Sequence, residues 1–269
     1  MTESAGASAA GPAKTPYFVR PGFNNIVPYI MVKGADRLLE FLKAAFTASE
    51  RIRVPQADGS ILHAEVGIGD SVIELGEANE QHPPRPTTVH LYVDDADATY
   101  GRALQAGASS IYKVDDQFWG DRQGSVQDEF GNVWNIAMAK GWTPGPEGMR
   151  GVQPYLHLRN AHEMIPFAQS AFRAEALGVT KSAEGKVLHA TIRIGSGTFE
   201  IDEASEETPA MPCYLHIYVP DADACYAEAL RAGATSVEPP NDKPYGERSA
   251  TVKDPFGNTW FLATYTGAA

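Results

Sequence analysis

Phe130-Gly131-Asn132-Val133-Trp134 recurs 126 residues later as Phe256-Gly257-Asn258-Thr259-Trp260. At the same offset, residues 27–138 align with residues 153–264 without a gap. A repeat of this length is a whole module rather than one unit of a solenoid, whose period is roughly 20–50 residues. The chain is therefore predicted to contain two copies of one module. Positions that are identical in both copies are expected to serve the fold, and positions that differ to carry functional asymmetry.

Each copy divides again into two similar halves. In the first copy, strands are predicted at 26–32, 51–54, 61–68 and 71–76 with a helix at 35–46, and then strands at 88–93, 110–112, 124–128 and 133–137 with a helix at 96–106. Asp94 or Asp95 is expected to cap the second helix, which ends before Gly107. The predicted fold class is α+β, built from four βαβββ units.

The composition is that of a soluble globular protein, with 43% hydrophobic and 21% charged residues. No apolar run approaches the ~18 residues that a membrane-spanning helix needs. The net charge of −12 argues against duplex nucleic acid or an anionic membrane as a partner, because neither supplies cations. Cys213 and Cys225 are too few for a disulfide framework, so a reducing, cytoplasmic setting is expected.

The ends of the repeat suggest the domain boundaries. Residues 1–22 are rich in Ala, Gly, Ser and Pro and are predicted to form a disordered arm; without a basic leader and an apolar core they are not expected to be a signal peptide. A linker at 142–150 is predicted between a first module at 23–141 and a second at 151–267. A monomer is expected, since the tandem copy supplies the partner that a single module gains by dimerising.

From Asn25 to Tyr265 this arrangement resembles the vicinal oxygen chelate superfamily, which contains glyoxalase I, bleomycin-resistance proteins and extradiol dioxygenases. The most specific matches are the ending at 254–260 and the loop at 118–122, Phe-Trp-Gly-Asp-Arg. They look like the branch labelled "3-demethylubiquinone methyltransferase-like". Methyltransferase activity is not expected, because the sequence contains no glycine-rich loop for S-adenosylmethionine. The resemblance implies that paired βαβββ units form two cupped mixed sheets, with ligand or metal on the concave face.

The resemblance also places metal ligands at four fixed positions on the strands of each module. These positions are Val27, Glu74, His90 and Asn135 in the first copy, and Gln153, Glu200, His216 and Phe261 in the second. If units pair within a copy, each cup keeps its own four. If units pair across the copies, one cup gathers Gln153, Glu200, His90 and Asn135, and the other keeps Glu74 and His216 beside two apolar residues. The crossed pairing concentrates the polar residues in one cup.

Two interpretations of the Glu and His residues remain open. As metal ligands, the candidates are Gln153, Glu200, His90, His216 and Glu74, a set that suits Zn²⁺, Mn²⁺, Ni²⁺ or Fe²⁺. The metal would polarise a substrate with vicinal oxygens, and Glu200 would be the catalytic residue. Alternatively, each Glu–His pair is an internal hydrogen-bonded pair in a cavity that binds an organic ligand without metal.

Strand alternation predicts which other residues line the cups. Aromatic side chains with polar tips suit a planar ligand. The predicted ligand-binding residues are Tyr29, Tyr92, Trp119, Tyr155, His157, Asp202, Tyr218 and Tyr245. Of these, His157 and Asp202 correspond to Met31 and Gly76 in the first copy, so the cup that contains Glu200 is expected to be the more polar one.

The sequence therefore favours a small-molecule binding protein of the resistance or sequestration type, with no obligatory metal. The alternative is a divalent-metal-dependent lyase, isomerase or dioxygenase that acts on a substrate with vicinal oxygens. A third reading is a catalytically silent regulatory partner, suggested by the N-terminal arm. The identity of the ligand does not follow from the fold.

Overall fold

The computed structural model describes residues 18–139 and 151–267. The predicted α+β fold with four βαβββ units is confirmed. The first copy contains β1 (Ile26–Val32), α1 (Ala35–Phe46), β2 (Ser49–Pro55), β3 (Ile61–Ile68) and β4 (Ser71–Glu77), followed by β5 (Thr88–Tyr92), α2 (Ala96–Gln105), β6 (Ser109–Asp116), β7 (Asp121–Gln127) and β8 (Val133–Ala139). Asp95 caps α2 by accepting a hydrogen bond from the Ala98 amide.

The second copy repeats this order. It contains β9 (Val152–Leu158), α3 (Ala161–Phe172), β10 (Glu175–Lys181), β11 (Val187–Ile194) and β12 (Gly197–Glu203), followed by β13 (Tyr214–Tyr218), α4 (Ala222–Arg231), β14 (Thr235–Lys243), β15 (Glu247–Lys253) and β16 (Thr259–Tyr265).

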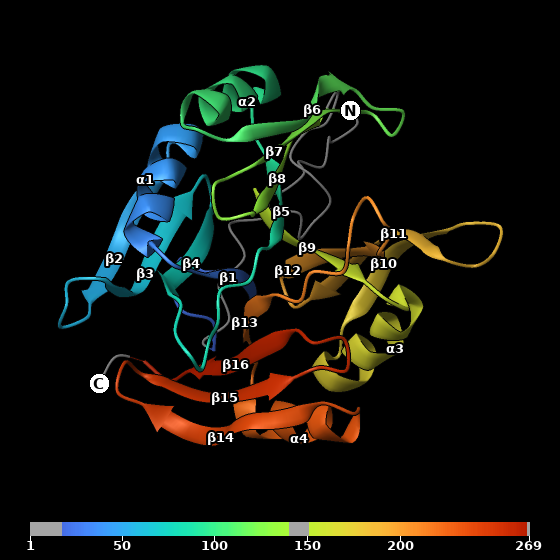
Figure 1. Ribbon diagram of the computed structural model, residues 1–269. Coiled ribbons are helices and arrows are strands. Elements are labelled where there is room, and N and C mark those ends of the chain that lie inside the picture. Colours follow the sequence, from blue (N-terminus) through green and yellow to red (C-terminus); the bar gives the residue numbers. More distant parts are fainter. Residues whose placement is uncertain (1–17, 140–150, 268–269) are drawn as a thin grey trace, which may run out of the picture.

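The units pair across the two copies. Sheet A has the strand order β14-β15-β16-β13-β1-β4-β3-β2, and sheet B has the order β10-β11-β12-β9-β5-β8-β7-β6. Each eight-stranded mixed sheet thus joins the first unit of one copy to the second unit of the other (Figure 1). The junctions are antiparallel, with Val27 opposite His216 in sheet A and His90 opposite Gln153 in sheet B. Of the two pairings that the sequence left open, the crossed one is present.

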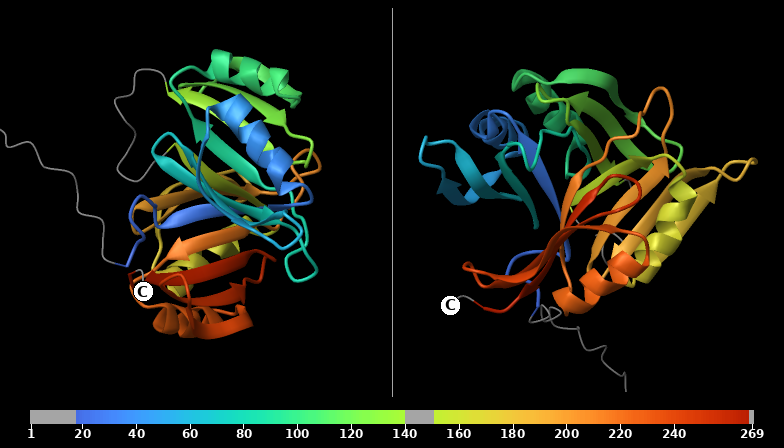
Figure 2. Two further views of the ribbon diagram at one scale, coloured as in Figure 1. Left: turned by 90° about the vertical axis from the view of Figure 1, so that its left-hand side faces the viewer. Right: turned by 60° about the horizontal axis from the view of Figure 1, so that its bottom comes forward.

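The hydrophobic cores, by contrast, form mainly within each copy; the exceptions are Ile26, which joins the core of the second copy, and Val152, which joins that of the first. Helices α1 and α2 lie side by side, as do α3 and α4, on the outside of the molecule (Figure 2). The core under α1 and α2 contains Ile73 from sheet A together with Leu91 and Trp134 from sheet B. The core under α3 and α4 is formed by the equivalent strands and helices and includes Trp260. Apolar burial therefore holds each copy together, and the sheets join the copies.

The repeated Phe-Gly-Asn-x-Trp motif fixes the turn before the last strand of each copy. Asp254 accepts hydrogen bonds from the Trp260 indole at 2.8 Å, from the Asn258 side chain at 2.8 Å, and from the backbone amides of Phe256 and Asn258. Asp128 has the same partners in the first copy. Each buried carboxylate thus accepts hydrogen bonds from the donors of the turn and fixes the tryptophan in the core beneath the helices.

The end of the N-terminal arm is packed, which corrects part of the expected disorder over residues 1–22. Val19 and Phe23 are buried in a small cluster with Val27, Val72, Tyr218 and Ala263. The Phe18 carbonyl accepts a hydrogen bond from the Tyr265 amide at 2.9 Å. Residues 1–17 and 140–150, which include most of the predicted arm and linker, lie outside the described residues.

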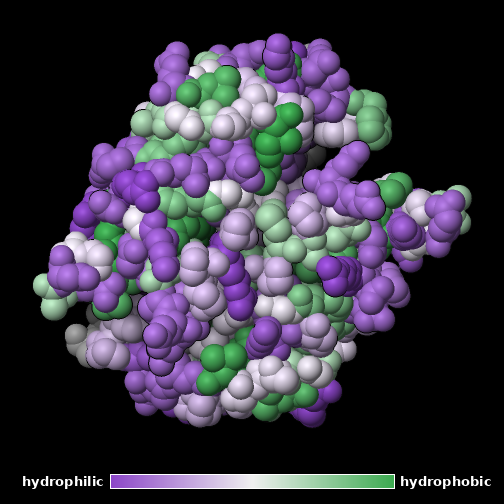
Figure 3. All heavy atoms as spheres, viewed as in Figure 1, coloured by the Kyte–Doolittle hydropathy of each residue, from purple (hydrophilic) through white to green (hydrophobic). Residues whose placement is uncertain are grey.

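On the face seen in Figure 3, hydrophilic residues dominate and hydrophobic residues form separate small patches. Over the residues that the structure describes, no helix has the length and apolar character needed to cross a membrane.

Asp254→Ala tests the role of the repeated turn. The change leaves the Trp260 indole and the Asn258 amide buried without an acceptor, so we expect the free energy of unfolding to fall by about 2–4 kcal/mol. Urea unfolding followed by tryptophan fluorescence measures the loss. Asp223→Ala, on an exposed side chain, is the control and is expected to change stability far less. Equal losses in the two variants would contradict the structural role.

Candidate functional site

The strand pattern places the Glu and His residues on the face opposite the helices. Ile73 and Leu75 point into the helix-side core, so Glu74 between them points to the concave face of sheet A. His90 lies between the core residues Val89 and Leu91 and points to the concave face of sheet B. We call these concave faces cup A and cup B.

A buried ion pair lies at the centre of cup B. His90 Nδ1 is 2.8 Å from the Glu200 carboxylate, which is 2% exposed. Burial alone would lower the pKa of His90, but the Glu200 carboxylate outweighs burial and the pKa is raised. Burial would raise the pKa of Glu200, but His90 and His189 lower it to about 2. Because His90 comes from the first copy and Glu200 from the second, the pair crosses the junction of the copies.

Further polar pairs surround this ion pair. His157 Nδ1 is 2.6 Å from the Asp202 carboxylate, and the Tyr155 ring lies against His157 with centroids 4.9 Å apart. The ring of Tyr92 stacks on His90 at 4.5 Å. The Tyr92 hydroxyl donates to Asp121 at 3.3 Å. Cup B thus combines two buried histidines with two half-buried tyrosines.

Cup B also holds buried polar atoms whose partners are missing. Within the described residues, four buried side-chain nitrogen or oxygen atoms have no hydrogen-bond partner: Thr88 Oγ1, His90 Nε2, Gln123 Oε1 and His216 Nε2. Strand alternation places the first three on the concave face of sheet B, because Val89, Leu91 and Val126 point the other way. Buried polar atoms are normally satisfied, so these three atoms have hydrogen-bonding capacity that no described group of the protein uses.

The predicted metal ligands of cup B are neighbours in the strand register, with His90 opposite both Gln153 and Asn135, and they are hydrogen-bonded to other side chains. The Glu200 carboxylate is directed at His90 Nδ1, and the Gln153 side-chain oxygen accepts a hydrogen bond from Thr198 at 3.1 Å. In cup A, Val27 and Phe261 flank His216 in the strand register and offer no donor atom. Among the described residues, no group of three or more His, Cys, Asp or Glu side chains has an arrangement that could hold a metal ion. A carboxylate bonded to the ring nitrogen instead orients the histidine.

Cup A contains the matching pair with different surroundings. His216 Nδ1 is 2.9 Å from the Glu74 carboxylate, and His216 Nε2 is 3.7 Å from Glu247. Burial alone would lower the pKa of His216, but Glu74 raises it to about 9. The buried Tyr218 hydroxyl donates to Glu247 at 2.8 Å. Tyr29 donates to or accepts from His63 at 3.0 Å.

Cup A contains polar groups beyond those that the sequence predicted. Besides Glu74, it contains the buried carboxylates of Glu65 and Glu247, and Arg20 forms an ion pair with Glu65. These residues lie on strands β3 and β15 and in the arm, none of which supplies ligand positions in the family pattern. The sequence did contain an indication for Glu247, because the residue that aligns with it in the first copy, Asp121, is also acidic. Glu65 aligns with Thr191, so the repeat alignment gave no indication that Glu65 belongs to the site.

The predicted ligand-binding residues divide between the two cups. Cup B receives Tyr92, Tyr155, His157 and Asp202, and cup A receives Tyr29 and Tyr218. Trp119 and Tyr245 occupy equivalent hairpin tips at the rims and are 52% and 58% exposed. Burial raises the pKa of Asp121, and the Trp119 indole is one of the groups that oppose this increase. Sequence reasoning missed Thr88, Gln123 and Asp121 in cup B.

This fold, with polar cups between paired βαβββ units, defines a vicinal-oxygen-chelate architecture. The sequence model of the Glyoxalase/Bleomycin resistance protein/Dioxygenase superfamily matches residues 22–136 and 159–262, and the chain belongs to this superfamily. An uncharacterised protein of Mycobacterium bovis is 38% identical over 120 residues, covering 40% of this chain and 79% of the relative. An uncharacterised protein of Mycobacterium tuberculosis has the same identity over 120 residues, with 71% of the relative covered.

Among solved structures, glyoxalase I from Zea mays superposes with a TM-score of 0.67 at 15% sequence identity, covering 89% of this chain and 92% of the plant enzyme. At this identity the likeness shows a shared fold and does not transfer the activity.

The His216–Glu74 pair should make stability depend on pH. A histidine pKa raised from 6.5 to about 9 gives stability that is complete below pH 6.5 and is lost as pH rises through 9. The lowered pKa of Glu74, relative to 4.5, gives stability that is present above pH 4.5 and is lost as pH falls. The pair should therefore contribute most between about pH 4.5 and 6.5, with a decline on the order of 2–3 kcal/mol towards pH 9.5.

Urea unfolding of the wild type and of the double variant Glu74→Gln/His216→Gln at pH 5–10 checks this expectation. The double variant removes both charges and should decline less above pH 6.5. Identical pH profiles would show that the pair carries no net charge change on folding.

Proposed function

We propose that the chain is a small-molecule binding protein that holds its ligand in cup B without an obligatory metal. The ligand would be a planar organic molecule that carries hydrogen-bonding oxygen atoms. The observation that carries this proposal is that three of the four buried polar atoms without a partner, among the described residues, line cup B. A ligand that satisfied Thr88, His90 and Gln123 would remove the cost of burying them unpaired.

The walls of cup B support a planar ligand. Tyr92 and Tyr155 offer half-buried aromatic surfaces on both sides of the His90–Glu200 pair. The side chain of His189 is 44% exposed, and its Nε2 atom is 3.7 Å from Glu200. Trp119 at the rim could cover a flat ring. The His90 ring, oriented by Glu200, would direct Nε2 to an oxygen atom of the ligand.

The matched cups provide an internal control for this proposal. The probe is 4-nitrocatechol, a flat ring with vicinal oxygens whose absorbance reports binding. His90→Gln removes the oriented ring in cup B, and His216→Gln makes the same change in cup A. We expect affinity to fall at least roughly tenfold in the first variant, the equivalent of one charged hydrogen bond, and to change little in the second. No binding to the wild type, or equal losses in both variants, would contradict the assignment to cup B.

The divalent-metal-dependent lyase, isomerase or dioxygenase is the second candidate, because His90 Nε2 is a buried nitrogen without a partner. In that case Glu200 would be the catalytic residue, and Zn²⁺, Mn²⁺, Ni²⁺ or Fe²⁺ the metal. We expect dialysis against a chelator to leave probe binding unchanged and added metal to stabilise the protein only at high concentration. Elemental analysis of untagged protein checks the metal content. Stoichiometric metal that survives the chelator would favour the enzyme. The cytoplasmic location and the monomeric state stay predictions.

A further inference from the structure

The segment formed by residues 18–23, here called the N-terminal segment, lies against cup A. The Phe18 carbonyl is bonded to the Tyr265 amide at the end of β16, and the Arg20 carbonyl accepts a hydrogen bond from the Phe23 amide at 3.0 Å. Val19 and Phe23 are buried, and the Phe23 ring meets Tyr218 edge-on with centroids 5.7 Å apart. The segment is thus held by backbone bonds and apolar contacts, with Arg20 between its two anchors.

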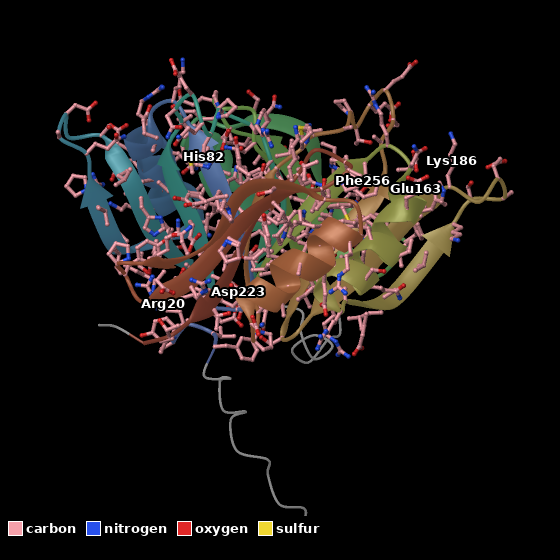
Figure 4. All side chains as sticks on the ribbon, turned by 90° about the horizontal axis from the view of Figure 1, so that it is seen from below. Arg20, His82, Glu163, Lys186, Asp223 and Phe256 are labelled. Atoms are coloured by element: carbon pink, nitrogen blue, oxygen red, sulfur yellow. The ribbon has the colours of Figure 1, made fainter. Side chains whose placement is uncertain are left out.

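Arg20 directs its guanidinium at the carboxylates of cup A. Figure 4 shows Arg20 near the start of the described chain, and its nearest acidic partner is Glu65, whose side chain is 3% exposed. The guanidinium carbon lies over the Phe23 ring, 5.2 Å from the centroid. Burial would lower the pKa of Arg20, but Glu65, Tyr218 and Glu247 outweigh burial and raise it. The Arg20 guanidinium therefore offsets part of the negative charge of cup A.

The charges of cup A require a second cation. Glu65, Glu74 and Glu247 are each no more than 3% exposed. His216 pairs with Glu74, and the nearest histidine to Glu65 is the partly exposed His63, whose Nε2 is 3.6 Å away and therefore beyond hydrogen-bond distance. A buried carboxylate without a counter-charge is strongly unfavourable. Cup B has Thr191 at the position of Glu65 and carries its third carboxylate at Asp202 instead, next to His157, so the carboxylate that Arg20 meets is specific to cup A.

A guanidinium matches this cup better than a simple ammonium ion. Its planar fork can bond to a carboxylate while its face stacks on an aromatic ring, and Arg20 has both partners in Glu65 and Phe23. His216 Nε2, in a side chain at least nine-tenths buried, has no hydrogen-bond partner among the described residues and lies 3.7 Å from Glu247.

We propose that cup A is a binding site for a guanidinium group, and that Arg20 of the same chain occupies it. The N-terminal segment then closes cup A to free ligands of this class. Removal of the Arg20 side chain opens the site to alkylguanidinium ions from solution. This site is independent of the ligand site proposed in cup B.

Chemical rescue of the full-length Arg20→Ala variant tests the proposal. We expect its Tm to be lower than that of the wild type by about 5 °C, a value reduced from that of a fully buried pair because the Arg20 side chain is 27% exposed. Ethylguanidinium at millimolar concentration should raise the Tm of this variant in a saturable manner and leave the wild type unchanged. Ethylammonium at the same ionic strength should have a much smaller effect.

Arg51→Ala is the matched control. Arg51 also lies over the Phe23 ring, at 5.4 Å, and donates to the Gly22 carbonyl, but it is exposed and forms no ion pair in the described residues. Ethylguanidinium should not restore its Tm. If Arg20→Ala does not fold, Arg20→Gln keeps part of the side-chain stem for the same titration. Equal effects of ethylguanidinium on the Arg20 variant and the wild type, or rescue by ethylammonium to the same extent, would overturn the proposal.

Discussion

The antiparallel junctions β1–β13 and β5–β9 hold the two copies in their crossed arrangement. They join the first unit of each copy to the second unit of the other copy. The hydrophobic cores beneath the helices do the reverse and hold the two units of one copy together. Neither copy can therefore complete a sheet alone, and neither sheet can complete a core alone. The interlocking of the two patterns makes the whole chain one cooperative structure.

The buried ion pairs owe their existence to the same junctions. His90 meets Glu200, and His216 meets Glu74, only because strands of different copies are neighbours. A buried ion pair does not by itself add much stability, since the cost of removing two charges from water offsets the attraction. Pairing within each copy would instead bring Glu74 to His90 and Glu200 to His216, so the ion pairs do not by themselves select the crossed arrangement. In the crossed arrangement they fix the orientation of the two buried histidine rings.

The sequence was sufficient to predict the elements and the inward-facing residues, because repeat alignment, helical periodicity and strand alternation are local signals. Ile26–Val32 and Ala35–Phe46 were predicted with the bounds that the structure has. The choice between pairing within and across copies could not be predicted, since both arrangements bury the same faces. His90 and Gln153 are far apart in sequence, and only the sheet register makes them neighbours.

The candidate site was predicted in part, and the errors have a physical cause. The Glu–His pairs follow from the family positions, whereas Arg20 belongs to a stretch whose composition indicates disorder. Residues 18–22 of that stretch pack on the protein because Val19 and the adjacent Phe23 are buried and Arg20 pairs with a buried carboxylate. The average composition of a segment does not show that one of its side chains can pair with an opposite charge on a distant strand.

The covalent link between the copies explains how the two cups came to differ. In a dimer of identical single modules, a substitution in one cup changes both cups, so a carboxylate at the position of Glu65 would be buried twice and would need two counter-charges. In the tandem chain the second position is Thr191, and a single arginine at one end of the chain is sufficient. Cup A can then be filled from within the molecule while cup B keeps its unpaired polar atoms. The duplication thus allows the two cups to carry different charged side chains.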